Sequence, residues 1–371
     1  MYFKAYKTNN TPINYGKLIY DSRVDELAIE NPIVVQELNA SGSFTCTIPV
    51  THPFYDEFNY INLDEIDIVE YAEDNTVIDH IFGGILGEKT IDFFGNKTLT
   101  FYGYSIMLHN SYMPRQDFTG LTLNDVANTI QQALIMNYGG VKSGHYLFSF
   151  GDYSTYPVGG QIYSCNETVY EFFDRLKEFY PNIAVNYLTK YMSTYIRYQS
   201  FVYLGDFLIA STQEIEVGKN LLDYTEDILD GDFATGVIGY GAETEAEWYG
   251  RKVRLYVADD NLPTYDKVYW NTNLRSVYGD KVKSITWDDV DNINTLKSRT
   301  STYASSMKIK RNLKCKLFDL SKITNVDRLE VGESLWAYPP RYQAREMFHI
   351  TKIERNLNDP SQDNVEMINY Y

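Results

Sequence analysis

One short segment, from Ser43 to Val50, limits the possible folds more than any other part of the sequence. Its apolar side chains recur at every second position: Phe44, Cys46, Ile48 and Val50. A period of two is the pattern of a half-buried β-strand. The turn-forming residues 39–42 precede it, and Pro49 and Pro53 follow, where a missing N–H ends a strand ladder. The segment therefore predicts one strand of an antiparallel β-domain.

Further strand-like segments fill the rest of the first hundred residues. They cover Leu63–Tyr71, Ile81–Gly87 and Lys97–Tyr104, and Phe94–Lys97 supplies a turn between two of them. Many short strands separated by turn residues are typical of a small barrel or sandwich. Strand-like segments return from about residue 205 and continue to the end of the chain. We see no internal sequence repeat, low-complexity tract or long linker.

Three segments have helical spacing instead. The first begins at Thr122–Asp125, which resembles a capping box. The second begins at Asn166 and stops before Pro181, with apolar residues on one side at Val169, Phe172, Phe173, Leu176 and Phe179. The third runs from Trp287 to about Met307, with acidic residues in its first turn, as the helix dipole prefers.

Composition excludes several classes of protein. The chain has 371 residues, 33 basic and 50 acidic, for a formal charge of −17, which disfavours tight nucleic-acid binding. No apolar run is long enough to cross a membrane, and the N-terminus lacks a signal-peptide core, so we expect folding in a cytoplasm. The three cysteines are widely spaced and argue against a zinc site or disulfide framework. The 34 tyrosines suit strands, protein interfaces or, less directly, carbohydrate binding.

Three local patterns resemble chemical sites, and each has a structural explanation. Residues 84–90 resemble a phosphate loop, but Glu88 breaks the required spacing and the following residues 91–95 read as a strand and turn, which leaves no helix N-terminus for a phosphate. Cys165 before the helix cap Asn166, with His145 upstream, fits the outline of a cysteine endopeptidase but has no protease pattern around it. A dense acidic cluster lacks the alternation of a calcium loop and is expected to be a solvated loop: Asp223, Glu226, Asp227, Asp230 and Asp232.

The histidines show no metal-binding spacing either: His52, His80, His109, His145 and His349. His52 is expected to be a turn residue, and Cys46 a packing residue. A pair of carboxylates at glycosidase spacing cannot be recognised from sequence alone. No catalytic, cofactor-binding or metal-binding residue is therefore predicted, and no cofactor.

Three ordered blocks of sequence resemble one known family. The first is Glu37–Asp56, with its Glu-Leu-Asn turn, strand, Ile-Pro and His-Pro. The second joins Gly218–Asp223 to Ala234–Ala242, similar to "GKNLLD … ATxxxxxGA" with Tyr240 in place of a more usual Leu. The third pairs Glu330–Leu335 with Phe348–Pro360. Together they resemble the baseplate hub proteins of tailed bacteriophages, also called tail-associated lysins or phage minor structural proteins.

The resemblance implies a mainly β fold with α+β insertions: two β-barrel-like domains of similar fold, each interrupted by an inserted domain. With the strand-like and helical segments, this predicts four domains. The first barrel is 1–111 with 205–238, and it is interrupted by an α+β domain at 112–204. The second barrel is 239–275 with 308–371, and it is interrupted by a helical insertion at 276–307.

The resemblance also implies a function. We expect a homotrimeric hub at the tail tip that caps the tail tube, docks on a hexameric distal tail protein and gates release of the tape-measure protein and DNA. Receptor-binding proteins of the baseplate are further expected neighbours, and DNA only passes through. We expect no enzyme activity, because the chain ends just after the third block. Two alternatives stay open: a tail-associated peptidoglycan hydrolase of the endopeptidase type, and binding of a host saccharide receptor.

Overall fold

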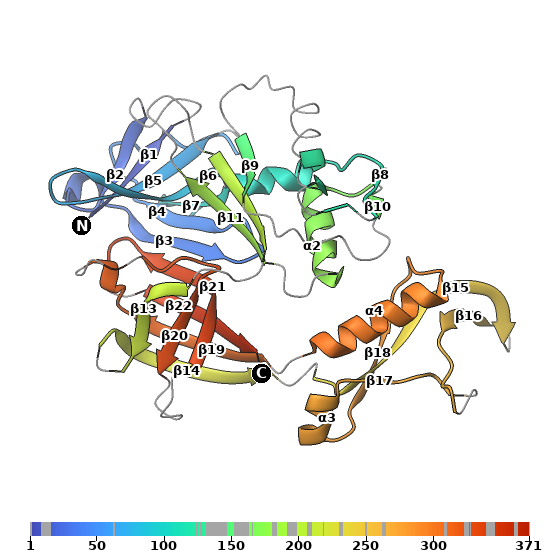
Figure 1. Cartoon of the computed structure of the whole chain (residues 1–371). Coiled ribbons are helices and arrows are strands. Elements are labelled where there is room, and N and C mark those ends of the chain that lie inside the picture. The colour runs from blue at the N-terminus through green and yellow to red at the C-terminus, as the bar shows by residue number, and fades with distance from the viewer. Residues whose placement is uncertain are drawn as a thin grey trace.

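The computed structural model describes most of the chain. The residues that it does not describe are 1, 9–15, 62–63, 120, 123–124, 127, 131–146, 152–162, 165, 180–183, 191–198, 206–209, 218, 230–232, 249–250, 262–264, 308–309, 323–325, 327, 339–345, 360–362 and 371. Figure 1 shows two curled β-domains stacked on each other, with one insertion beside the first and another standing apart from the second.

The first β-domain contains seven strands and one short 3₁₀ helix. They are β1 (Tyr2–Lys7), β2 (Lys17–Asp21), η2 (Asp25–Leu27), β3 (Glu30–Glu37), β4 (Ser43–Ile48), β5 (Glu65–Tyr71), β6 (Val77–Ile91) and β7 (Lys97–Gly103). As predicted, β4 alternates, and Phe44, Cys46 and Ile48 are buried while Val50 lies beyond its end. The predicted turn before β7 is confirmed by Gly95, whose φ of 88° suits glycine.

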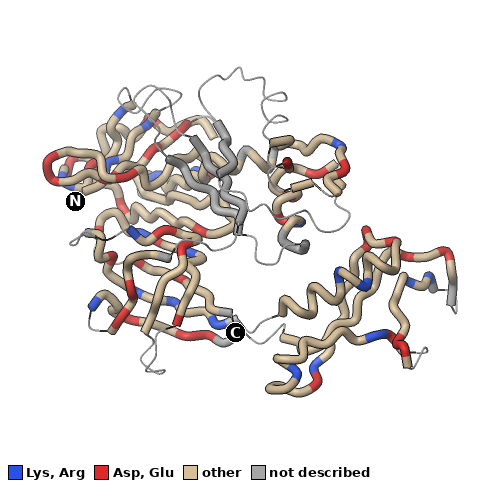
Figure 2. The backbone as a smooth tube through the Cα atoms, in the orientation of Figure 1, with Lys and Arg blue, Asp and Glu red and all other residues tan. Residues whose placement is uncertain are grey.

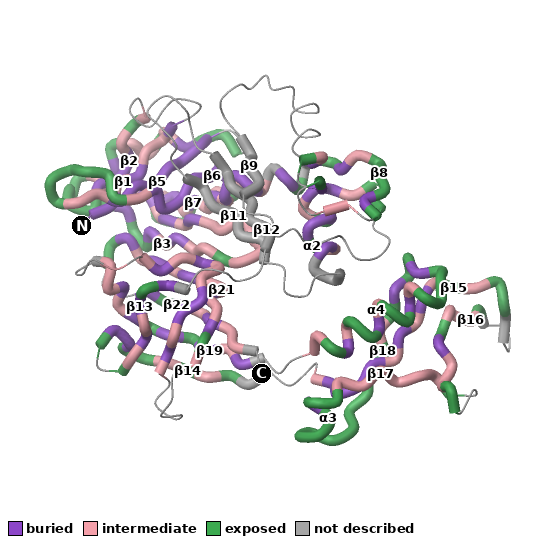
Figure 3. Tube along the Cα trace, in the orientation of Figure 1, coloured by how far each residue is buried: buried purple, intermediate pink, exposed green. Residues whose placement is uncertain are grey.

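The second β-domain is built from strands after Lys310 and two earlier strands that lie before the second insertion. Its elements are β13 (Ala210–Glu216), β14 (Leu221–Leu229), β19 (Lys310–Leu317), η4 (Leu320–Lys322), β20 (Ser334–Tyr338), β21 (Glu346–Asn356) and β22 (Asp363–Tyr370). Each domain has its own apolar core, centred on residues such as Phe44 and Phe101 in the first and Leu313 and Phe348 in the second. Figure 3 shows buried residues along the inner strands of both domains.

Two insertions interrupt this β scaffold. The first contains η3 (Tyr104–Asn110), β8 (Gln116–Asp117), β9 (Leu147–Gly151), β10 (Tyr163–Ser164), α2 (Val169–Phe179), β11 (Ala184–Lys190) and β12 (Gln199–Gly205). The second contains β15 (Gly236–Trp248), β16 (Arg251–Tyr256), β17 (Tyr269–Trp270), α3 (Thr272–Tyr278), β18 (Val282–Thr286) and α4 (Ile293–Ser306). In the second, α4 covers one face of a four-stranded sheet (Figure 1).

Capping side chains set the helix starts. Thr122 and Asp125 bond reciprocally, with the Asp125 N–H donating to the Thr122 hydroxyl at 3.2 Å, so the predicted capping box is confirmed. The next helix begins later than predicted, because Thr168 and Glu171 form its capping box. The last also begins later: Asn292 caps α4, so the acidic residues after Trp287 precede the helix.

Strand pairing differs from the predicted boundaries in two places. The sequence prediction joined 205–238 to the first barrel, but β13 pairs with β20 and β14 with β19, both in the second β-domain. It also put 239–275 in the second barrel, whereas β15 pairs with β16, β17 and β18 around a core that includes Trp287 and Leu296. Alternation identifies a strand but carries no information about a distant partner, which is why local patterns assigned both segments incorrectly.

A glycine pattern explains how the second insertion packs. Gly239 and Gly241 lie on β15 within the block that resembled the phage family. A Cβ at Gly239 would lie 2.0 Å from the Thr300 hydroxyl of α4, and one at Gly241 would lie 2.4 Å from the Val290 carbonyl. The absence of side chains at these two positions therefore lets α4 and its preceding turn approach the sheet closely.

Candidate functional site

The two β-domains repeat one strand order. In the first the order is β3-β4-β7-β6-β5-β1, with β2 added beyond β1, and in the second it is β14-β19-β22-β21-β20-β13. They differ at the last position, where β1 runs antiparallel to β5 but β13 runs parallel to β20. The two domains are therefore copies of one architecture.

The copies are joined edge to edge. The end of β21 pairs with β3, with Lys352 opposite Glu37 and Asn356 opposite Ile33, so one sheet runs through both domains. The tip that follows β21 enters the first domain: Leu357 is 1% exposed and belongs to that domain's apolar core. Its N–H donates to the Pro32 carbonyl at 2.9 Å. This pairing and insertion define the domain junction.

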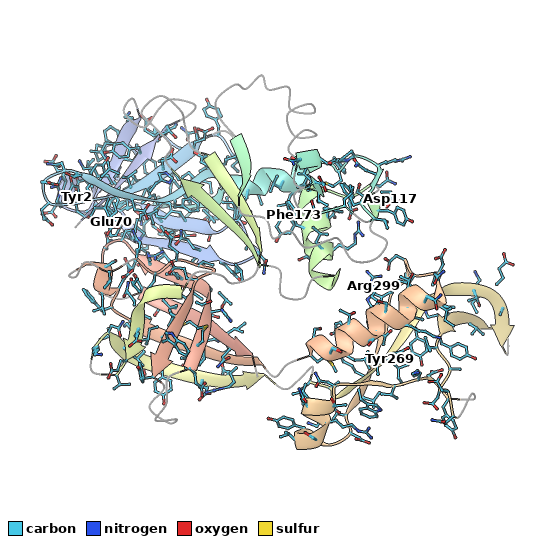
Figure 4. The ribbon with its side chains drawn as sticks, viewed as in Figure 1. Tyr2, Glu70, Asp117, Phe173, Tyr269 and Arg299 are labelled. Carbon is cyan, nitrogen blue, oxygen red and sulfur yellow. The ribbon has the colours of Figure 1, made fainter. Side chains whose placement is uncertain are left out.

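Buried ionic side chains cross the same junction. Arg328 from the second domain bonds the carboxylate of Glu70 and lies 3.5 Å from that of Asp79, both in the first domain. Burial lowers the pKa of Arg328, but four nearby carboxylates, with Glu70 and Asp79 first, outweigh burial and the net pKa is raised. Figure 4 labels Glu70 on the side of the first domain that faces the second. The guanidinium is thus held charged between the domains.

A second arginine completes the polar part of the domain junction. Arg355 on β21 donates to the Leu329 carbonyl at 2.7 Å and to the Gln36 side chain of β3, and it lies 3.6 Å from Asp363. Gln36 in turn donates to the Ile81 carbonyl at 3.1 Å. These contacts fix the orientation of the domains through both ladder pairing and side-chain geometry.

The first domain carries an exposed apolar tip between β6 and β7. Its exposed fractions are 58% at Ile91, 97% at Phe93 and 78% at Phe94. The loop is nevertheless rigidly hydrogen-bonded, because the Asp92 carboxylate accepts from the N–H groups of Phe94 and Asn96, each at 2.8 Å. A preorganised loop with two exposed aromatic rings is suited to contact with another protein. We call residues 91–96 the aromatic tip.

The second domain carries an exposed strand edge. Among the described strands, β14 pairs only with β19, so its other edge is open beyond Leu221, which forms a bridge with Val217. Leu222 on this strand is 56% exposed, and Asp223 and Asp227 are exposed as well. Figure 2 shows acidic residues along β14. An open edge presents backbone donors and acceptors to a further strand.

The sequence-predicted candidates do not assemble into a catalytic centre among the described residues. Cys46 and Cys315 are buried and free, and burial raises the pKa of each thiol to about 12. His52 is buried and accepts a hydrogen bond from the Phe54 N–H at 3.1 Å, which fits its predicted turn role. Cys165 and His145 lie outside the described residues.

The acidic and glycine-rich segments also have structural partners. The expected solvated loop is wrong for Asp223, Glu226 and Asp227, which lie on β14. Glu226 bonds Arg311 on β19, and Asp227 lies 3.8 Å from Lys314. Asp230 and Asp232 lie outside the described residues. Residues 84–90 form part of β6, which includes the predicted strand Ile81–Gly87. The described residues contain no group of three or more His, Cys, Asp or Glu side chains placed to hold a metal ion.

One pairing that the sequence did not suggest is Ser334 with His349. The Ser334 hydroxyl lies 2.8 Å from Nδ1 of His349 across β20 and β21, within hydrogen-bond distance of a base. Ser334 is 3% exposed, so a substrate carbonyl has no direct approach to it. The pair is a cross-strand contact. His80 has a similar environment, 3.1 Å from the buried Asp67.

Sequence reasoning missed both the aromatic tip and the domain junction. A signal for the tip was present, since Asp92-Phe93-Phe94-Gly95-Asn96 places two aromatic residues inside a turn. The junction had no local signal, because Arg328 and Glu70 are 258 positions apart. No described helix is long and apolar enough to cross a membrane.

Two edge-joined β-domains with insertions define a class of fold that recurs in known structures of tail proteins. The 43 kDa tail protein of prophage MuSo2 from Shewanella oneidensis aligns with a TM-score of 0.61 and 9% identity, over 100% of this chain and 98% of that one. A tail protein from Neisseria meningitidis MC58 gives 0.58 and 11%, over 99% and 96%. Prophage tail protein gp18 from Listeria monocytogenes EGD-e gives 0.55 and 10%, over 100% and 94%.

No protein-family model matches the sequence, and neither does any curated protein sequence. At these identities, the structural likeness establishes the fold alone. The predicted fold class, mainly β with α+β insertions and of the phage hub type, is confirmed. The chain thus has the fold of phage tail proteins along its whole length.

Proposed function

We propose that this protein is a structural component of a phage-type tail, acting as a homotrimeric hub at the tail tip. The observation that carries the proposal is the duplicated β-domain within a fold shared over the full chain with tail proteins. Three copies contribute six similar domains, which suits docking on a hexameric distal tail protein. Closed rings of identical copies are the usual form of such assemblies.

In this role the β-domains form the ring and the insertions project from it. The second insertion stands apart from both β-domains in Figure 1 and is the element best placed to move. The insertions narrow or close the central channel, and their displacement releases the tape-measure protein and then DNA. A net charge of −17 favours passage, because an acidic wall repels phosphates. The protein acts by assembly and gating, without covalent catalysis.

The direct test is the mass of the purified protein in solution, measured with and without its distal tail protein. We expect a trimer, and a larger complex when the hexameric partner is added. A chain that stays monomeric and ignores the partner contradicts the proposal. Receptor-binding proteins of the baseplate are tested in the same way, by adding them to the preformed complex.

A turnover assay on purified cell walls tests the absence of enzyme activity. We expect no release of peptidoglycan fragments. Clear hydrolysis that is lost in the Cys165→Ala variant would replace the purely structural role with that of an endopeptidase. Binding of the isolated protein to host cells would instead favour saccharide recognition.

A further inference from the structure

Around β6 and β21, the two β-domains match residue by residue. In β6 the ladder to β7 is irregular between Leu86 and Glu88, and in β21 the ladder to β22 is irregular between Ile350 and Lys352. When these two irregularities are superposed, the ladders on the opposite edges of β6 and β21 also correspond. There Ile85 pairs with Glu65 on β5, and His349 pairs with Ser334 on β20. The same alignment brings together positions of like burial, including the two buried cysteines, Cys46 on β4 and Cys315 on β19.

The alignment identifies what the aromatic tip corresponds to. Ile91 corresponds to Arg355, and Phe93, two residues further, corresponds to Leu357. In the second domain these positions are covered by the first domain: Arg355 is 3% exposed and Leu357 is 1% exposed. In the first domain they are 58% and 97% exposed. The tip is thus buried against the other domain after β21 but exposed to solvent after β6.

The alignment identifies the receiving surface as well. The end of β21 pairs with β3, and the strand that corresponds to β3 in the second domain is β14. That strand has the open edge described above, with Leu222 exposed beside it. Beyond Leu86, β6 pairs only with β7 among the described strands, so its end is also open on the corresponding side. One chain therefore displays one uncovered tip and one uncovered receiving strand.

We propose that the aromatic tip of one copy binds the β14 edge of a second copy, in the way that the tip after β21 binds β3 within each chain. Transferring the internal register, in which Glu354 faces Val35 and Arg355 faces Val34, places Thr90 opposite Asp227 and Ile91 opposite Glu226. Phe93 then follows the paired residues, as Leu357 follows Arg355 and Asn356 within the chain. The inference rests on the proposed ring assembly and assigns its contact.

This contact is heterologous, because the tip and the receiving strand are different surfaces. Each copy thus uses its tip on one neighbour and its β14 edge on the other. Repetition builds a head-to-tail ring in which internal junctions and junctions between copies alternate and have similar geometry. The ladder supplies backbone pairing, and the two aromatic rings supply apolar burial at its end.

The first experiment compares Phe93→Glu with Val277→Glu by light scattering after gel filtration. Val277 is a matched control, because it is 71% exposed and lies on α3 in the second insertion. We expect the control to keep the wild-type mass and Phe93→Glu to shift to the 43.0 kDa monomer. Since Phe93 is 97% exposed, its melting curve should keep the wild-type transition of the monomeric fold.

The second experiment is a cross-link that does not depend on loss of assembly. Residues directly opposite in an antiparallel ladder have Cα atoms about 4.5–5.5 Å apart, within disulfide range. Thr90→Cys with Asp227→Cys, in a Cys165→Ala background, should give covalent oligomers on a non-reducing gel. Each single cysteine variant, and the pair Thr90→Cys with Asp288→Cys, should not.

The results separate this contact from the proposed function. If the protein is a trimer but Phe93→Glu remains one and the cysteine pair gives no cross-link, the assigned contact is wrong and the hub proposal stands. If the wild-type protein is a monomer with and without its distal tail protein, the hub proposal fails and this contact fails with it. Cross-links that need both cysteines support both.

Discussion

Replacing Arg328 with methionine tests whether the ionic part of the domain junction holds the two β-domains together. The Arg328 side chain is 14% exposed and bonds Glu70, which is 4% exposed, across the boundary between the domains. Methionine fills similar volume but removes the charge. Glu70 is then left as a buried carboxylate without its counter-charge, while Asp79, at 44% exposure, remains hydrated.

The expected cost follows from that unpaired charge. Removing one partner of a buried ion pair typically costs about 3–5 kcal/mol. For a β scaffold of this size, a loss of that magnitude lowers the melting temperature by roughly 6–20 °C. Differential scanning calorimetry at a fixed protein concentration measures it, since assembly makes the melting temperature depend on concentration.

A control variant and a rescue variant show whether the loss of stability comes from the buried ion pair. Lys219→Met removes an exposed pair with Glu216, whose side chains are 61% and 37% exposed, and should leave the melting temperature close to that of the wild type, because solvent screens such a pair. Adding Glu70→Gln to Arg328→Met should recover part of the lost stability, because no buried charge then stays unpaired. If Arg328→Met melts like Lys219→Met, the ionic contact does not hold the domains together and the reasoning is refuted.

Three further predictions concern other parts of the fold. Gly239→Ala places a Cβ 2.0 Å from the Thr300 hydroxyl and should destabilise the second insertion by about 1–3 kcal/mol, seen as faster limited proteolysis there; an unchanged cleavage rate would contradict the close packing of α4. Cys46 and Cys315, whose pKa values burial raises to about 12, should not react with Ellman's reagent at pH 8 in a Cys165→Ala variant until the protein is denatured; rapid labelling of the native protein would show that they are not buried. Burial raises the pKa of Asp319, but hydrogen bonds from Gln213 and Ser321 outweigh burial and hold this pKa below its ordinary value. The ionised carboxylate therefore stabilises the fold above the unfolded-state pKa, and this stabilisation is lost as pH falls through the folded-state pKa. Asp319→Asn should therefore be less stable than wild type at neutral pH in urea titrations, with a gap that narrows in acid; a gap independent of pH would contradict this.

The local elements were predictable because their signals are local. Alternation identified β4, and a reciprocal Thr122–Asp125 pair identified a helix start. The acidic residues after Trp287 gave a wrong helix start because two factors compete there. Helix dipoles favour acidic residues near the N-terminus, but the Asn292 side chain accepts from two backbone N–H groups and fixes the first turn.

The domain architecture was not predictable in the same way. Copies of the β-domain share almost no residues at corresponding positions, since burial requires only apolar character, as at Phe44 and Leu313 or Phe101 and Met367. The second insertion also separates β14 from β19 in sequence, although the two strands are paired. The repeat is therefore visible in the ladder register but not in a comparison of the two sequences, and the correspondence between the aromatic tip and the tip after β21 could not be recognised from sequence.

The internal junction makes a last prediction that separates its two halves. Leu357→Ala removes a side chain that is 1% exposed within the core of the first β-domain, and should cost about 2–5 kcal/mol in a single chain. Phe93→Ala, at the corresponding position of the aromatic tip, removes a side chain that is 97% exposed and should leave the stability of an isolated chain nearly unchanged. Urea unfolding of both variants at a concentration low enough to keep the chains separate makes the comparison. Equal losses would mean that Phe93 already packs within its own chain, and its exposure would then have no bearing on assembly. A large loss for Leu357→Ala alone would show that the same structural element serves folding in one domain and is free to serve association in the other.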